Sequence, residues 1–82
     1  MERVILEPLE DRPAWEVRVE GQRVGLLWRE RKFFRGVAEG TDTPLPTKFN
    51  SREAAARALA RKAGFDDLGD VIVADDRKGG SR

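Results

Sequence analysis

The sequence contains no cysteine, no histidine and no tyrosine. Without cysteine the chain has no disulfide bond and no thiolate ligand for a metal, and it is compatible with the reducing cytoplasm. The same absences remove the commonest general acids, general bases and nucleophiles that work near neutral pH. The only serines are Ser51 and Ser81, and no glycine-rich phosphate loop precedes a helix. We therefore expect no enzymatic activity and no cofactor.

The sequence also lacks a long apolar run, and we expect neither a signal peptide nor a membrane span. It has one asparagine, one glutamine and one methionine, whereas 38% of its residues are charged. This composition resembles that of heat-adapted proteins, although high-GC codon usage would explain it equally well. Its 82 residues suffice for one domain with a small core. We expect a single cytoplasmic domain at residues 1–76 and a flexible polar tail at residues 77–82.

Charge is unevenly distributed along the chain, although the formal net charge is only +1. Residues 1–20 carry three basic and six acidic groups, and residues 63–76 carry five acidic groups and no basic one. Residues 21–62 carry ten basic and four acidic groups, and residues 77–82 add three basic groups. A central basic block thus lies between two acidic ends. If those ends fold side by side, the molecule is an electric dipole.

The first half of the chain has the pattern of a β-meander. Trp15, Val17 and Val19 alternate with charged residues, which is typical of a half-buried strand. Gly21-Gln22 supplies a tight turn to the next strand. The expected strands are residues 3–7, 14–20, 23–30 and 32–39.

The hairpin formed by the last two of these strands can adopt two registers. A two-residue loop would set Arg35 beside Leu26 on the core side, which would bury a charge. We prefer a three-residue loop at residues 30–32, because it avoids burying this charge. The inner face then carries Val24, Leu26, Trp28, Phe34 and Ala38, and the outer face carries Leu27, Arg29, Phe33, Arg35 and Val37.

The segment "FNSREAAARALARKAGF" predicts a helix with readable ends. Asn50 is the expected N-cap, with Glu53 completing a capping box. Gly64 is the expected left-handed C-cap residue, and Phe65 its apolar contact. Residues 70–74, "DVIVA", predict a final strand that pairs near the first one. The fold class is therefore α+β, with strand order along the chain β-β-β-β-α-β: an antiparallel meander with one helix on one face and a C-terminal strand.

These features resemble a group of short bacterial domains of unknown function. Such domains combine a W-x-V…G strand, a helix that begins (S/T)-x-x-E-A, and an apolar V-x-V strand. The resemblance implies the same fold and no particular activity. This sequence departs from the pattern in a longer stretch between Arg31 and Lys48 and in the early position of the Glu53-Ala54 pair. The matching positions are Trp15, Val17, Gly21, Ser51, Ala54, Ala58 and Val71 to Val73.

The stretch "LLWRERKFFRG", residues 26–36, mixes aromatic and basic residues and admits three interpretations. The first is a nucleic-acid surface, in which cations contact phosphates and Phe33 stacks on an unpaired base. The second is a patch for another protein or for a second copy of the chain. The third is a face covered by the first strand, the 40–48 connector or the tail, with solvated charges around it. The nucleic-acid residues would be Arg18, Arg29, Lys32, Phe33 and Arg35, and the apolar patch would be Leu27, Phe33 and Val37.

Two observations weigh against nucleic acid, and one favours it. The net charge is near zero, whereas dedicated nucleic-acid-binding domains are usually strongly basic. Glu16, Glu20 and Glu30 lie on or near the expected contact face and repel phosphate. In favour, basic groups outnumber acidic groups by six in residues 21–62.

One acidic cluster raises the remoter possibility of a metal-dependent hydrolase. Its members do not have the spacing of a calcium loop, and solvated or loop-capping aspartates are the expected explanation. We expect no metal site. The cluster consists of Asp66, Asp67, Asp70, Asp75 and Asp76.

Overall fold

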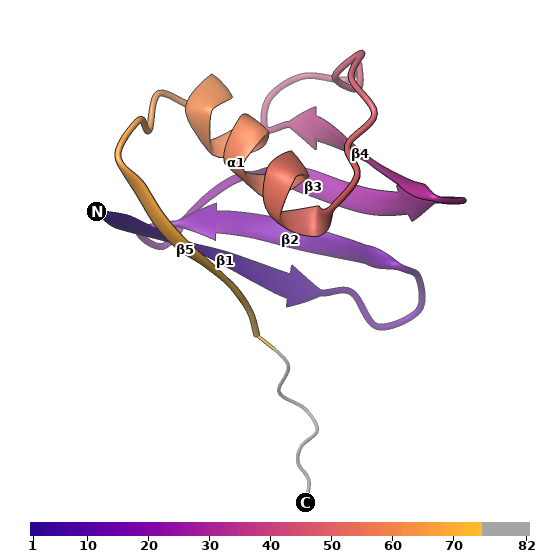
Figure 1. Cartoon of the computed structure of the whole chain (residues 1–82), viewed down its shortest axis with the longest axis horizontal. Helices are drawn as coiled ribbons and strands as arrows, with labels where there is room; N and C mark the ends of the chain where they lie inside the picture. Colours follow the sequence, from indigo (N-terminus) through magenta and orange to yellow (C-terminus); the bar gives the residue numbers. More distant parts are fainter. Residues whose placement is uncertain (75–82) are drawn as a thin grey trace, which may run out of the picture.

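A computed structural model describes residues 1–74 as one five-stranded sheet with a single helix packed on one face (Figure 1). The strand order across the sheet is β4-β3-β2-β1-β5. This arrangement confirms the expected α+β fold. The elements are β1 (Glu2–Pro8), β2 (Ala14–Val19), β3 (Gln22–Glu30), β4 (Phe33–Ala38), α1 (Arg52–Lys62) and β5 (Leu68–Val73).

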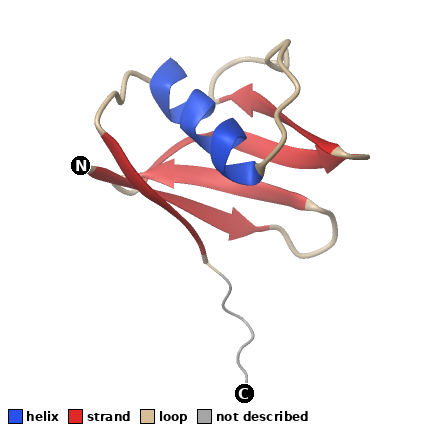
Figure 2. Ribbon diagram, in the orientation of Figure 1, coloured by secondary structure: helices blue, strands red, loops and turns tan. Residues whose placement is uncertain are grey.

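The first four strands form the expected antiparallel meander, and β5 then joins the opposite edge of the sheet. The chain crosses from β4 through α1 to β5, which pairs parallel to β1, with Val4 beside Val71 (Figure 2). The sheet is therefore mixed. Because β1 and β5 are neighbours, the two acidic ends of the sequence do lie side by side. The predicted domain end at residue 76 and the tail 77–82 lie outside the described residues.

The helix ends are set by local hydrogen bonds. The N-cap is Ser51, whose side chain accepts a hydrogen bond from the backbone N–H of Ala54 at 3.1 Å. The prediction of Asn50 is therefore wrong by one residue. At the other end Gly64 has φ +102°, and Phe65 donates its backbone N–H to Ala60. This pattern is the left-handed C-terminal cap that the sequence predicted.

The register of the β3–β4 hairpin differs from the prediction. Arg29 pairs with Phe34 and Glu30 with Phe33, which leaves a two-residue loop, and its first residue, Arg31, has φ +62°. Phe34 packs against the core as expected, whereas Phe33 is 38% exposed on the other side of β4.

A β-bulge explains why Trp28 points outward. Val17 pairs with Gly25 but Arg18 pairs with Arg23, so Val24 is an extra residue in β3. The extra residue reverses the alternation of side chains beyond it. The inward positions of β3 are consequently Val24, Gly25 and Leu27, and the predicted core residues Leu26 and Trp28 lie on the opposite face.

The same reversal removes the objection to a two-residue loop. Arg35 pairs with Trp28 and Val37 with Leu26, all on the face turned away from α1. Because Leu26 itself faces outward, the neighbouring Arg35 does not bring a charge into the core.

Leu59 is the point at which the helix packs on the sheet. Its side chain is fully buried, and it covers Gly25 of β3 and Gly36 of β4. A Cβ atom at Gly36 would lie 3.1 Å from the end of the Leu59 side chain, and one at Gly25 would lie 2.5 Å from the backbone oxygen of Val37. The two glycines therefore form a hollow that admits Leu59.

We expect Gly25→Ala to destabilise the fold more than Gly36→Ala. The first adds a methyl group against rigid backbone, at a cost of about 1–3 kcal/mol or more. The second presses on a flexible side chain that can move. Urea unfolding of both variants measures the difference, and a larger loss for Gly36→Ala would contradict this packing.

Leu59→Ala is expected to lower the free energy of unfolding by about 2–5 kcal/mol, because it leaves a cavity above both glycines. Thermal or urea unfolding measures it. A matched control is Leu9→Ala, since Leu9 is 36% exposed. A loss for Leu59→Ala no greater than that of the control would show that the helix does not depend on this contact.

Candidate binding surface

The outer face, meaning the sheet face turned away from α1, is the surface on which the binding hypotheses depend. Neither β1 nor the 40–48 connector covers it: β1 is a strand of the sheet, and the connector follows the edge of β4. Leu45 donates its backbone N–H to Gly36 at 2.7 Å, and Phe49 forms a bridge with Phe34. Among residues 1–74, the connector therefore touches the outer face only along β4, where Leu45 contacts Arg35 and Lys48 lies over the Phe33 ring.

Arg18, the first residue of the predicted nucleic-acid site, is held by carboxylates. Its Nε atom lies 3.1 Å from Glu16 and 3.5 Å from Glu7. Arg23, directly across the strand pair, contacts both Glu16 and Glu39 at 2.9 Å. This network neutralises the part of the outer face nearest the β2–β3 turn, so Arg18 does not join the other predicted site residues.

Glu16 and Glu2 have pKa values shifted in opposite directions. The guanidinium group of Arg23, helped by that of Arg18, lowers the pKa of Glu16. The Glu2 carboxyl group shares a hydrogen bond with Glu20, which raises the pKa of Glu2 because two like charges meet there. Both effects belong to the part of the molecule away from the β3–β4 loop.

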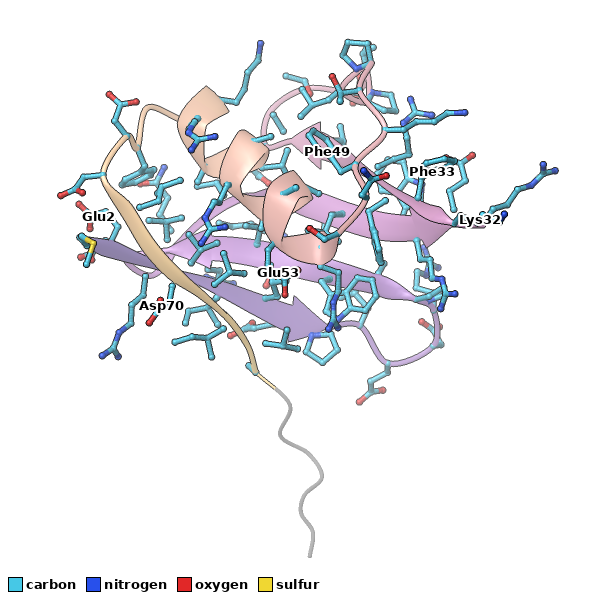
Figure 3. All side chains as sticks on the ribbon, viewed as in Figure 1. Glu2, Lys32, Phe33, Phe49, Glu53 and Asp70 are labelled. Carbon is cyan, nitrogen blue, oxygen red and sulfur yellow. The ribbon has the colours of Figure 1, made fainter. Side chains whose placement is uncertain are left out.

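The other predicted cations gather where β3 turns into β4. We call this region the hairpin end and define it as Arg29, Arg31, Lys32, Phe33 and Lys48. None of its four cations forms an ion pair with a carboxylate of residues 1–74. Figure 3 shows Lys32 and Phe33 at one end of the molecule, with Glu2 and Asp70 toward the other.

The Phe33 ring forms part of a hollow at the hairpin end. The hollow has a volume of about 410 Å³ and is lined by Phe33, Glu30, Arg31, Lys32 and Lys48. The Nζ atom of Lys48 lies 5.6 Å from the centre of the ring, a cation–π contact. Three cations and one carboxylate thus surround a partly exposed aromatic face.

Arg35 lies on the outer face between the hairpin end and Trp28. Its guanidinium group contacts Glu30 at 3.5 Å and the backbone oxygen of Leu45 at 3.3 Å. Its Nε atom is buried and has no hydrogen-bond partner in the described part of the chain. Arg35 is therefore half-buried and held in place, and it offers less charge to a ligand than the residues of the loop.

The predicted apolar patch loses one of its three members. Leu27 is fully buried beneath the helix because of the bulge in β3, so it cannot contact a partner. Val37 and Phe33 remain on the outer face, and Leu26 takes the place of Leu27 opposite Val37. An isolated glycine inside a strand can indicate a bulge, so Gly25 was the signal that could have revealed this exchange.

A second hollow, which we call the Trp28 groove, lies on the outer face beside the β1–β2 loop. Its volume is about 310 Å³. The lining is mainly apolar, and its two charged residues are Arg12 and Arg29. Sequence reasoning missed this site because it placed Trp28 and Leu26 in the core. The lining residues are Leu9, Arg12, Pro13, Ala14, Leu26, Trp28 and Arg29.

The aspartate cluster offers no metal site in the described region. Within residues 1–74 no group of three or more carboxylates is placed to hold a metal ion, and Asp67 instead lies 3.6 Å from the N-terminal amine. Asp75 and Asp76 lie outside the described residues. In the same part of the chain, no helix is long and apolar enough to cross a membrane.

Comparison with protein-family models, with curated proteins and with solved structures finds no match to this chain. The resemblance to short bacterial domains therefore stays a prediction.

We expect Glu16→Gln to weaken the acid dependence of stability. The folded-state pKa of Glu16 lies below its unfolded value, so its contribution is present at neutral pH and is lost as the pH falls below about 4.5. The variant should be less stable than the parent at neutral pH and should approach it in acid. Urea unfolding across this pH range measures the effect.

Glu20→Gln serves as the contrasting variant. The pKa of Glu2 is raised in the folded state, so its favourable contribution is present in acid and is lost as the pH rises. Removing the Glu20 charge should leave stability at neutral pH unchanged or increase it. Equal losses in both variants at neutral pH would contradict the opposite pKa shifts.

Proposed function

We propose that this chain is a small binding module without catalytic activity of its own, and that it binds single-stranded nucleic acid weakly at the hairpin end. Lys32, Arg31 and Lys48 contact phosphates, and Phe33 stacks on an unpaired base. The cytoplasmic location expected from the composition belongs to the same proposal.

The observation that carries this proposal is the contrast between paired and unpaired cations. Arg18, Arg23 and Arg35 are neutralised by carboxylates of the outer face. The cations of the hairpin end have no such partner among residues 1–74 and surround an aromatic ring. A phosphate group there meets positive charge without first breaking an ion pair. The low net charge of the chain limits affinity, because few counterions are released.

Of the five nucleic-acid residues expected from the sequence, Lys32 and Phe33 line this smaller site, and Arg29 lies beside it at the strand position opposite Phe34. Arg35 lies at its border, and Arg18 is excluded by its ion pairs. Arg31 and Lys48 are additions that only the folded chain brings together.

We expect Lys32→Gln and Lys48→Gln each to weaken the binding of a thymidine oligonucleotide of about ten nucleotides and to reduce its dependence on salt. Removing one phosphate contact lowers the slope of log K against log salt by about 0.7 for single strands. Fluorescence anisotropy at two low salt concentrations measures both quantities.

The matched control is Arg61→Gln, because Arg61 is an exposed cation in the last turn of α1, far along the chain from the loop. It should leave binding and slope close to those of the parent. Absence of any binding at low salt would contradict the proposal, and so would an equal effect of all three substitutions, which would indicate a diffuse charge effect.

Self-association is a second candidate, favoured by the apolar residues that remain on the outer face. Phe33 and Ile72 are 38% and 39% exposed, and Leu26 and Val37 form a cross-strand pair on the same face. A two-fold dimer would bury apolar residues of this face against its own copy.

If this candidate holds, sedimentation at high protein concentration should show a dimer that Phe33→Glu splits, because a buried carboxylate would face an apolar partner. Lys62→Glu, at the exposed end of α1, is the control and should leave the dimer intact. A monomer at every concentration removes this candidate and leaves the nucleic-acid proposal untouched.

A further inference from the structure

The Trp28 groove and the hollow around Phe33 are lined by neighbouring residues of β3 and of the loop that follows it. Arg29 lines the groove, and the next two residues, Glu30 and Arg31, line the hollow around Phe33. Consecutive residues of the chain therefore line the two hollows.

Trp28 and Phe33 are diagonal neighbours on this face. Trp28 pairs with Arg35, and Glu30 pairs with Phe33, so the two aromatic residues stand at opposite corners of a cross-strand quartet. Diagonal positions of an antiparallel pair are roughly 7–8 Å apart. This distance suits two successive bases of an extended strand, each on its own aromatic ring. The Arg35–Glu30 ion pair occupies the other diagonal and separates the two rings.

The chemistry of the groove also fits a nucleotide. Trp28 and Leu26 with Ala14 provide an apolar floor, on which a base can lie flat. Arg12, whose Nε atom lies 3.7 Å from a carboxylate oxygen of Asp11, and Arg29 complete the lining. Arg29 donates its Nε–H to the backbone oxygen of Arg31 at 3.2 Å, which holds the guanidinium group beside the β3–β4 loop.

We propose that the Trp28 groove is a second base-binding subsite, so that the chain holds two successive unpaired nucleotides, one on Phe33 and one on Trp28. The inference rests on the proposed function. It adds that single strands are preferred over duplex, because paired and stacked bases cannot enter either hollow.

The experiment uses Trp28 as its own reporter. Trp15 lies on the inner side of the sheet, 6.1 Å from Phe34, so Trp15→Phe leaves Trp28 as the only indole while keeping an aromatic residue against the core. Titration of this chain with a thymidine oligonucleotide of about ten nucleotides at low salt is expected to change the Trp28 fluorescence as the base stacks on it.

Substitution of Trp28 then measures how much the groove contributes to the free energy of oligonucleotide binding. In the otherwise native chain we expect Trp28→Ala to weaken single-strand binding about tenfold or more, with little effect on duplex binding. Trp28→Leu keeps an apolar residue in the floor of the groove. It should still weaken binding, because it removes the aromatic ring on which a base would stack. Circular dichroism and melting show that both variants fold. Ile72→Ala, an exposed apolar residue on β5, is the matched control and should change nothing.

The outcomes separate the two proposals. Salt-dependent binding with silent Trp28 fluorescence, unchanged affinity in both Trp28 variants, or equal affinity for duplex overturns the second subsite and leaves the site at the hairpin end standing. Absence of oligonucleotide binding overturns both, and the groove is then open to an apolar protein segment instead. Loss of affinity in Trp28→Ala together with a fluorescence change supports the two-base site.

Discussion

The extra residue in β3 decides which side chains of the central hairpin reach solvent. Because Val24 has no partner of its own in β2, the alternation of β3 is reversed from Gly25 onward. Leu27 enters the core beneath α1, and Trp28 turns to the outer face. The packing of Leu59 on Gly25 and the position of the Trp28 groove both depend on this reversal. Without the bulge the groove would lose its floor.

The fold could be predicted from the sequence because its signals are local. The alternation of β2 and the glycine that ends α1 each indicate their element without reference to distant residues. The bulge is different, because "VGLLW" in β3 offers apolar side chains to both faces and fits either alternation. Gly25 was the one local sign of it. Its role is clear only with Leu59 above it, and that contact joins residues far apart in the sequence.

The charge distribution of the outer face was predictable in kind but not in extent, since residue counts do not show which charges neutralise each other. Arg18 and Arg23 face each other across β2 and β3, and the carboxylate of Glu16 lies between them. Arg29 and Arg31 belong to the same basic block as Arg23 but form no ion pair with a carboxylate of residues 1–74. The net charge of the chain is therefore a poor guide to its local field, which separates a neutralised region from a positive one.

At the hairpin end, packing on the inner face of the sheet fixes the positions of the side chains on the outer face. Phe34 packs against Trp15 with the ring centres 6.1 Å apart, and its backbone pairs with Phe49 through two hydrogen bonds. Because neighbouring residues of a strand point to opposite faces, fixing Phe34 inward also fixes Phe33 outward. Lys48 directly precedes Phe49, so the bridge between Phe34 and Phe49 also holds the Lys48 ammonium group near the Phe33 ring. The groups that would meet a ligand are therefore held in place by the fold, and such preorganisation would lower the entropy lost on binding.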